Sequence, residues 1–223
     1  MDKAIEDLSQ AIKVNPNQTD SYHHRAICLM ATRRLAEALR DGDTLVKLKP
    51  TDPESFATRG AIHSFGGQPK KAILDFSEAI RLDPRSPSHH TSRGSAYGSI
   101  ADWELALQDY NAALKLDGNF WVAWINRSSI RSACPDAKLR DGKKAIEDAQ
   151  QAIKVLKNSP MKVMVSQAEA ALASAYAEAG QFDEAVKWQQ KALENPFYKN
   201  SLGGLGQQNL KLYEAKKPRR IGQ

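Results

Sequence analysis

Two pairs of adjacent histidines, His23-His24 and His89-His90, are the residues of this chain that first suggest a metal site. Adjacent residues on a helix point about 100° apart, so neither pair can chelate an ion as residues four positions apart would. No cysteine or carboxylate cluster has the spacing of a ligand set either. We therefore expect neither a metal ion nor a cofactor.

Cys134 is the candidate nucleophile, because it lies in the segment "ACPDAKLRDG" beside Asp136 and Asp141, and a loop cysteine can be reactive. A cysteine enzyme also needs a positioned base, yet all five histidines lie before residue 91. The chain contains no Walker loop, glycine-rich dinucleotide turn, Gly-x-Ser-x-Gly or His-Glu-x-x-His sequence. The sequence therefore predicts a protein that is not an enzyme, with free thiols at Cys28 and Cys134.

Arginines and aspartates recur at a constant interval of 34 residues. A guanidinium near a helix interface needs a carboxylate, because an unpaired buried charge is costly. We expect each arginine to pair with an aspartate, so that Arg25 binds either Asp41 or the preceding Asp7. A row of phosphate sites is the alternative, and the matched aspartates disfavour it. The expected ladder consists of Arg25, Arg59, Arg93, Arg127, Asp41, Asp75, Asp109 and Asp148.

Small residues keep the same interval, and they indicate what the repeated segment is. Alanine occurs at positions 4, 38, 72 and 106, then at 145 and 185 after two insertions. A second small residue accompanies most of them, at Ala26, Gly60, Gly94, Ser128 and Ala173. Little more than a Cβ fits where two helices cross closely, so these positions predict the contact between two helices of one unit.

The local pattern predicts helices throughout. Ala72, Phe76, Ala79 and Ile80 have the spacing of one helical face, and no strand-like alternation is present. Prolines at 16, 50 and 84 mark helix ends, while Asp52-Pro53 and Ser86-Pro87 resemble an N-cap followed by a first-turn proline. Each unit is therefore predicted to be a pair of antiparallel helices.

On these residues the chain resembles the tetratricopeptide-repeat family over residues 2–196. The family's first-helix aromatics are matched by Tyr22, Phe56, Trp124, Tyr97 and Tyr176, and its second-helix residues by Phe76, Tyr110, Ala11, Ala79, Ala113, Ala152 and Ala192. The C-terminal part looks like a bacterial branch of that family. The resemblance implies an all-α solenoid, a right-handed superhelix whose first helices line a concave face.

We predict one domain over residues 1–223, with about five units, a preceding half unit and a capping helix. The half unit is residues 2–16, the helix pairs are 19–50, 53–84, 87–118, 121–157 and 160–196, the capping helix is 197–216, and the basic tail is 217–223. Ser159-Pro160 is expected to start a longer helix. Leu202, Leu205, Leu210 and Tyr213 are expected to form the buried face of the capping helix. Departures from the family pattern occur at Gly42, Arg131 and Glu169.

The first-helix positions that packing does not use predict a binding groove with few charges and many hydroxyl groups. It comprises Asp20, His23, His24, Ile27, Glu54, Thr58, Ala61, Phe65, Thr91, Ser92, Ser95, Ser99, Ile125, Asn126 and Ser129. The groove lacks the cationic set with which relatives clamp a C-terminal carboxylate. We expect it to bind a peptide or helix of a partner protein, although the working surface could instead be an edge of the stack.

Charge is concentrated at one end of the chain. The formal net charge is +6, of which residues after 210 contribute five cations and one anion, or +4, leaving +2 for the remainder. A long track for nucleic acid is therefore disfavoured. Since no catalytic motif is present, we expect no small-molecule substrate either. The tail "EAKKPRRIGQ" is expected to be a flexible end, and the alternative is contact with an acidic protein, a lipid surface or nucleic acid.

No apolar run approaches the roughly 20 residues that a membrane span requires, and no secretory signal is visible, so we expect a cytoplasmic protein. A repeat that begins at a second helix leaves Ala4 and Leu8 uncapped, and we expect further chain before residue 1. The predicted function is a non-catalytic scaffold. The alternative is a regulatory or docking module of a larger enzyme whose catalytic domain lies outside this chain.

Overall fold

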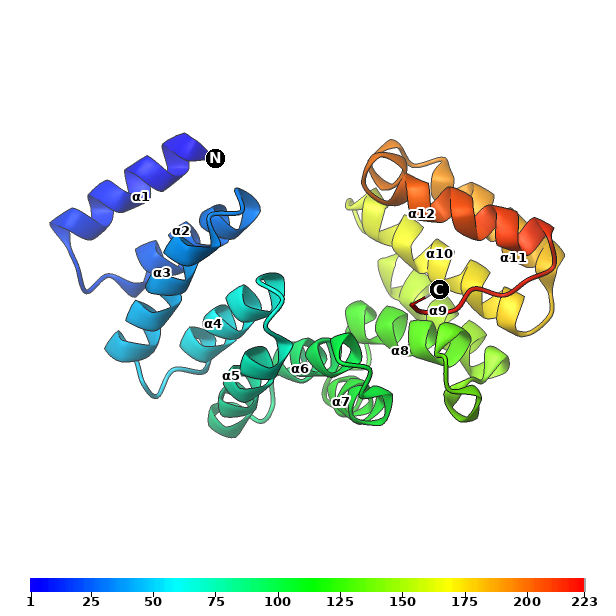
Figure 1. Cartoon of the computed structure of the whole chain (residues 1–223), viewed down its shortest axis with the longest axis horizontal. Coiled ribbons are helices and arrows are strands. Elements are labelled where there is room, and N and C mark those ends of the chain that lie inside the picture. The colour runs from blue at the N-terminus through cyan, green and yellow to red at the C-terminus, as the bar shows by residue number, and fades with distance from the viewer. Residues whose placement is uncertain (223) are drawn as a thin grey trace. The chain divides into compact units, whose positions relative to one another are not determined.

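The computed structural model describes residues 1–222, and every regular element in that range is helical (Figure 1). The predicted all-α fold of helix pairs is confirmed. Gln223, the last residue of the predicted tail, lies outside the described residues. Two compact units are present, Met1–Asp102 and the part from Trp103 onward. The boundary falls inside the predicted pair 87–118, so its two helices belong to different units.

Each unit is built from consecutive helices. Unit 1 contains α1 (Asp2–Val14), α2 (Thr19–Ala31), α3 (Leu35–Leu48), α4 (Pro53–Phe65), α5 (Pro69–Leu82) and α6 (Pro87–Ser99). Unit 2 contains α7 (Trp103–Leu116), α8 (Trp121–Ala133), the 3₁₀ helix η1 (Ala137–Leu139), α9 (Gly142–Leu156), α10 (Lys162–Glu178), α11 (Phe182–Leu193) and α12 (Pro196–Glu214).

The predicted helix starts are confirmed in unit 1. The Asp52 carboxylate accepts a hydrogen bond from the Ser55 backbone N–H at 3.0 Å, and the Ser86 hydroxyl accepts one from the His89 N–H at 3.4 Å. Proline occupies the first turn of both helices, where its missing N–H has no cost. The caps fix where α4 and α6 begin, and hence which of their residues face each other.

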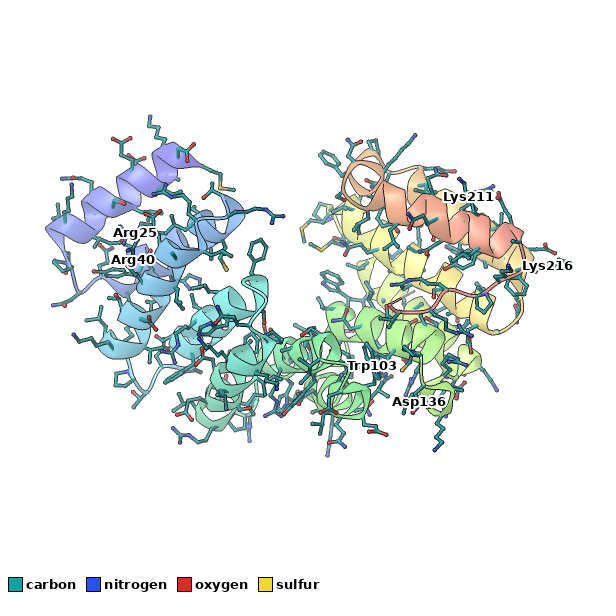
Figure 2. The ribbon with its side chains drawn as sticks, in the orientation of Figure 1. Arg25, Arg40, Trp103, Asp136, Lys211 and Lys216 are labelled. Atoms are coloured by element: carbon teal, nitrogen blue, oxygen red, sulfur yellow. The ribbon has the colours of Figure 1, made fainter. Side chains whose placement is uncertain are left out.

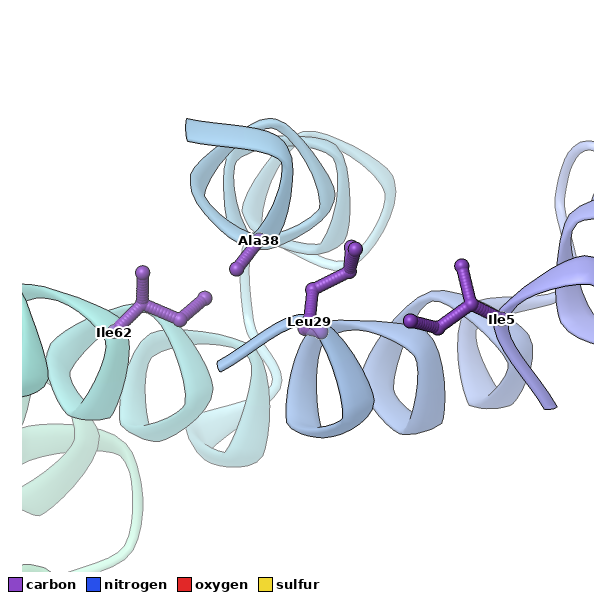
Figure 3. Close-up of a cluster of buried hydrophobic side chains, with 5 residues drawn as sticks. Ile5, Leu29, Ala38 and Ile62 are labelled. Carbon is purple, nitrogen blue, oxygen red and sulfur yellow. The ribbon is translucent and has the colours of Figure 1, made fainter. Parts of the chain in front are cut away.

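Close helix crossings occur where the small residues predict them. Ala38, Ala72, Ala106, Ala145 and Ala185 are all completely buried. Figure 3 shows one such crossing, where Ala38 lies among Ile5, Leu29 and Ile62. Ala4 occupies the same repeat position in α1, but it is exposed. The requirement for a small side chain therefore belongs to the crossing and not to the repeat position itself.

Glycine serves the same purpose within unit 1. A Cβ at Gly60 would lie 2.9 Å from the Phe76 ring of the paired helix, which is closer than real Cβ contacts. At Gly42, where the family pattern has an aromatic residue, a Cβ would lie 3.0 Å from the Ile62 side chain. Ile62 thus fills from α4 the space that an aromatic residue of α3 would take.

At two positions of unit 2, a charged residue replaces the aromatic residue of the repeat pattern and forms an ion pair. Arg131 replaces a buried tyrosine, and its Nη1 lies 2.7 Å from Asp148 Oδ2. Glu169 replaces an aromatic residue and is buried, with Lys191 Nζ 3.0 Å from its Oε1. The same ammonium lies 4.5 Å from the centre of the Trp188 ring. Each substituted position therefore carries an ion pair in place of an apolar contact.

Two local expectations for unit 2 are wrong in detail. The longer helix exists, since α10 has 17 residues against 13 in α8, but it begins at Lys162 and Ser159 does not cap it. In α12 the buried face includes Tyr198, Asn209 and Tyr213 together with Gly203 and Gly206. Leu202 and Leu205 remain exposed, whereas the predicted Tyr213 is fully buried and the predicted Leu210 packs against Ala192, Leu193 and Tyr198. The close approach to α11 is at Gly206, where a Cβ would lie 2.9 Å from the Leu193 side chain.

Replacing Ala38 with leucine should lower the free energy of unfolding of unit 1 by about 1–3 kcal/mol, because the added atoms have no space at the α2–α3 crossing. Ala4→Leu is the matched control, since it makes the same change at the same repeat position on an exposed surface, and it should change the value by less than about 0.5 kcal/mol. Urea unfolding followed by circular dichroism measures both. Equal effects of the two substitutions would contradict the proposed crossing.

Candidate functional site

Arg25, Arg59 and Arg127 each bind the aspartate of their own helix pair through one edge of the guanidinium, with two parallel hydrogen bonds. Arg25 Nε donates to Asp41 Oδ2 at 2.8 Å, and its Nη2 donates to Oδ1 at 2.6 Å. Arg59 and Asp75 repeat this fork at 3.0 and 2.7 Å. Arg127 makes it with Asp148, again at 3.0 and 2.7 Å. The aspartate side chains are almost fully buried, so these residues hold the helices together and are not available to bind phosphate.

The remaining nitrogen of each arginine reaches back to the preceding second helix, a contact that the sequence analysis missed. Nη1 of Arg25 donates to Ser9 Oγ at 2.9 Å, so Arg25 joins α2 to both α1 and α3. The equivalent contacts of Arg59, Arg93 and Arg127 are made with Asp43, Ser77 and Asn111 at 3.2, 3.2 and 2.6 Å. These four partners are themselves 34 residues apart, a signal that was present in the sequence.

Unit 1 presents its first helices on one side. Neighbouring first helices pack more closely together than neighbouring second helices do, so α2, α4 and α6 line the inner side of the stack. We call the surface along these three helices the unit 1 groove. The three helices carry the predicted residues Asp20, His23, His24, Ile27, Glu54, Thr58, Ala61, Phe65, Thr91, Ser92, Ser95 and Ser99, of which Thr58 and Thr91 are buried.

Two adjoining hollows lie in the unit 1 groove. The first, of about 300 Å³, lies between α2 and α4 and is lined by Thr19, Asp20, His23, Leu45, Lys49, Asp52, Glu54, Ser55 and Thr58. The second, of about 230 Å³, extends to α6 and is lined by His23, Ile27, Met30, Glu54, Ala57, Thr58, Ala61, Phe76, Ser88, His89 and Ser92. Because both include His23, Glu54 and Thr58, they form one continuous path.

Exposed carboxylates supply hydrogen-bond acceptors in the groove. Asp20 and Glu54 present exposed carboxylates, whereas the Thr91 hydroxyl already donates to the Pro87 carbonyl at 2.8 Å. His89 is 2% exposed, and its Nε2 has no hydrogen-bond partner although it lies 3.6 Å from Glu54 Oε1. A ligand that supplies donors would therefore fit this surface better than an anion would.

Some predicted groove residues have other environments. Ile125 of unit 2 packs against the buried side chains of α9 and α10, so it is part of a core and not a free apolar anchor. Asn126 and Ser129 lie beside it on α8, half-buried. In unit 1, Phe65 is 52% exposed, and the Arg33 guanidinium lies 6.0 Å from the centre of its ring. Ile27, at 44% exposure, is an exposed apolar residue that lines the second hollow, whereas Phe65 does not line it.

The structure gives little support to chemistry at the other candidates. Cys134 is completely buried, and burial raises the pKa of its thiol, so the reactive thiolate is disfavoured. Within residues 1–222 no three histidine, cysteine, aspartate or glutamate side chains are grouped to hold a metal ion. None of the helices in this range is long and apolar enough to cross a bilayer.

Comparison with family models gives two matches, both described as tetratricopeptide repeat. One covers residues 1–53 and the other covers residues 170–195. No curated protein matches the sequence. The two matched segments contain α1 to α3 and most of the α10–α11 pair, which are separate copies of the same helix arrangement.

Solved structures share the fold. A thermophilic tetratricopeptide-repeat protein of Thermus thermophilus has a TM-score of 0.69 at 20% identity, over 85% of this chain and 97% of its own. YrrB, described as having an unusual peptide-binding site, has a TM-score of 0.58 at 18% identity, over 93% of this chain and 100% of its own. Yeast Tom70 has a TM-score of 0.71 at 17% identity, over 95% of this chain but only 42% of its own.

His63 is a buried residue of α4 at a position where the family pattern has tyrosine, and it should make unit 1 sensitive to pH. Burial lowers its pKa below the ordinary value, and the Asp75 carboxylate, 3.8 Å from its Nε2, opposes that shift only in part. The neutral ring is therefore favoured in the folded state. Its contribution to stability is complete above a pH of about 6.5 and is lost as the pH falls through the lower, folded-state pKa.

We expect His63→Phe to reduce the loss of unfolding free energy between pH 7 and pH 5, values that bracket the ordinary histidine pKa of about 6.5. His24→Gln, at an exposed position of α2, serves as the control and should leave that loss unchanged. Urea titrations at both pH values supply the comparison. A His63→Phe chain with the same pH dependence as the unmodified chain would show that this ring does not set it.

Proposed function

Because the chain belongs to the tetratricopeptide-repeat family, we propose that it is a non-catalytic scaffold that binds an extended segment of a partner protein in the unit 1 groove. The continuous path between α2, α4 and α6 is the observation that carries this proposal. Pockets for small molecules typically have volumes of about 300–1,000 Å³ and enclose most of the ligand. Two adjoining open hollows at the lower end of that range suit successive side chains of a peptide better.

The two hollows favour different side chains. The one nearer α6 has apolar walls from Ile27, Met30 and Ala61, which suit an aliphatic side chain. The one nearer the start of α2 is lined by the carboxylates of Asp20, Asp52 and Glu54 and by a single cation, Lys49. A lysine or arginine would be attracted there, and its donors would meet the acceptors that line the groove. The preferred segment therefore pairs an aliphatic residue with a basic one.

The fold supports a peptide ligand in a general way. YrrB, which has the same fold, is described as carrying a peptide-binding site. First helices that expose small and polar side chains leave room for the backbone of an extended chain, and they offer acceptors for its N–H groups. A clamp for a C-terminal carboxylate is not part of this proposal, because the equivalent positions include Ile27, Thr58 and Ser92 in place of cations.

A library of random peptides displayed on phage tests this proposal directly. We expect enriched sequences to contain an aliphatic residue close to lysine or arginine, and a synthetic peptide of that sequence to bind the full chain in calorimetry. Ile27→Arg should weaken that binding at least about tenfold, because it places a cation at the apolar hollow.

Leu74→Arg is the matched control, since Leu74 is a 71% exposed residue on the second helix α5 and its substitution should leave binding unchanged. A peptide that loses affinity with Leu74→Arg and keeps it with Ile27→Arg would place the binding surface on the other side of unit 1. Failure of the library to enrich any sequence would also overturn the proposal.

A further inference from the structure

The carboxyl ends of α8 and α10 hold a carboxylate between two arginines. Glu178 is the last residue of α10, and its side chain is 14% exposed. Arg140, from the loop that follows η1, places its Nε 2.9 Å from Glu178 Oε1. Arg220, from the C-terminal segment, places its Nη1 2.7 Å from Oε2. One oxygen of this carboxylate is thus bound within the folded body. The other, Oε2, accepts no hydrogen bond from the described residues and is paired with Arg220 by charge alone, because Arg220 Nη1 donates to the Arg219 carbonyl at 2.8 Å.

Backbone carbonyls at and just after the end of α8 also accept hydrogen bonds from both Arg140 and the C-terminal segment. Arg140 Nη1 donates to the carbonyls of Cys134 and Pro135 at 2.7 and 3.0 Å. The Ala133 carbonyl accepts a hydrogen bond from the backbone N–H of Ile221 at 2.8 Å. Carbonyls at a helix end lack partners within the helix and carry partial negative charge, so they favour an incoming donor and a nearby cation.

The C-terminal segment reaches the ends of α8 and α10 through a hydrogen-bonded turn that follows α12. Lys216 has a φ of 54°, in the left-handed region, and its N–H donates to Tyr213 O while the Lys217 N–H donates to Leu212 O. This pattern ends α12 and reverses the chain, and Pro218 then disfavours a helical conformation at the preceding residue, Lys217. We call residues 215–222 the C-terminal strap. Figure 2 marks Lys216 at the turn, and Figure 1 shows the strap running back over unit 2.

We propose that the carboxyl ends of α8 and α10 form a second binding site, for an extended protein segment that carries an arginine followed by an aliphatic residue, and that the C-terminal strap occupies this site in cis. The inference is independent of the proposed function, because it concerns other helices in the other unit. It also replaces the expectation of a flexible tail, since Arg220 and Ile221 are engaged with unit 2.

The strap is suited to exchange with a partner. Its two fastening contacts are one backbone hydrogen bond and one arginine–carboxylate pair, and both are groups that any Arg-Ile segment supplies. Residues 218–221 are only half-buried. A short tether gives an effective concentration in the millimolar range, so a strap that is bound about nine-tenths of the time corresponds to a Kd of about 0.1 mM for the same segment in trans.

The test uses the full chain opened by the double substitution Arg220→Ala and Ile221→Pro, which removes the guanidinium and the N–H donor. A fluorescent peptide with the sequence of residues 216–222, KKPRRIG, is titrated against the opened chain and against the unmodified chain. We expect a Kd of about 0.1 mM for the opened chain and at least tenfold weaker binding to the unmodified chain, because its own strap competes. Circular dichroism verifies that both chains are folded.

Three further arms locate the peptide. Adding Glu178→Gln to the opened chain should weaken binding at least tenfold, whereas Glu194→Gln, at the exposed end of α11, should not. A peptide with alanine in place of the arginine that corresponds to Arg220 should also lose affinity. Adding Ile27→Arg should have no effect, because a loss there would place the basic peptide in the unit 1 groove, which would overturn this inference and leave the proposed function intact.

The inference is also overturned if folded opened and unmodified chains bind the peptide equally, if neither binds it, or if binding survives Glu178→Gln. Glu178→Gln also alters the contact with Arg140, so a second test keeps the carboxylate unchanged. Increasing amounts of the unlabelled peptide added to the unmodified chain should shift the Ile221 amide signal in an NMR spectrum toward that of a released strap. An unchanged signal at saturating peptide would contradict exchange.

Discussion

The fold depends on the hydrogen bonds with which the guanidinium groups of the ladder arginines hold neighbouring helices together. The nitrogens of one guanidinium serve different helices: Nε and Nη2 of Arg25 hold Asp41 on α3, while Nη1 reaches Ser9 on α1. A lysine in that position could supply only a point charge and could not make this planar, three-way contact. We infer that the arginines set both the spacing within a helix pair and the spacing between successive pairs, while the alanines and glycines allow the approach that these hydrogen bonds require.

This arrangement supports the proposal that the inner surface of unit 1 serves in recognition. The aspartates of the ladder are buried, and each is neutralised by its arginine, as Asp41 and Asp75 show. What remains exposed along α2, α4 and α6 is a mixture of carboxylates, hydroxyls and a few apolar side chains such as Ile27. A reactive centre needs unlike groups that converge on one point, whereas a repeated helix pair presents similar groups in a row. The latter suits an extended ligand.

The fold could be predicted from the sequence because its cause is periodic. The 34-residue interval of the alanines and of the arginine–aspartate pairs is visible without any structure, and the caps at Asp52 and Ser86 follow from local chemistry. The candidate groove was predicted less well, because whether Ile125 faces a ligand or its own core depends on how α8 and α10 meet after the insertions.

Contacts between remote and non-repeating segments could not be predicted. The leucine pattern of α12 predicted only part of its buried face, Leu210 and Tyr213, because Gly206, which permits close packing on Leu193, carries no hydrophobic signal. Nor does the spacing in the sequence indicate that Arg220 would meet Glu178, because a single charge pair between distant residues leaves no period. The partners of the third arginine nitrogen do recur every 34 residues, but they differ in type and do not look like a repeat. They are Ser9, Asp43, Ser77 and Asn111.

Hydrogen exchange in a chain with Arg25→Lys is the most direct measurement of these arginine hydrogen bonds. Lysine retains a positive charge near Asp41, but it cannot also hold Ser9, so α1 should open more readily on α2. The account predicts that amides of α1 exchange at least about fivefold faster, equivalent to the loss of roughly one hydrogen bond, while those of α4 and α5 stay unchanged. Unchanged exchange in α1 would show that apolar packing alone joins the successive pairs, and it would contradict the account.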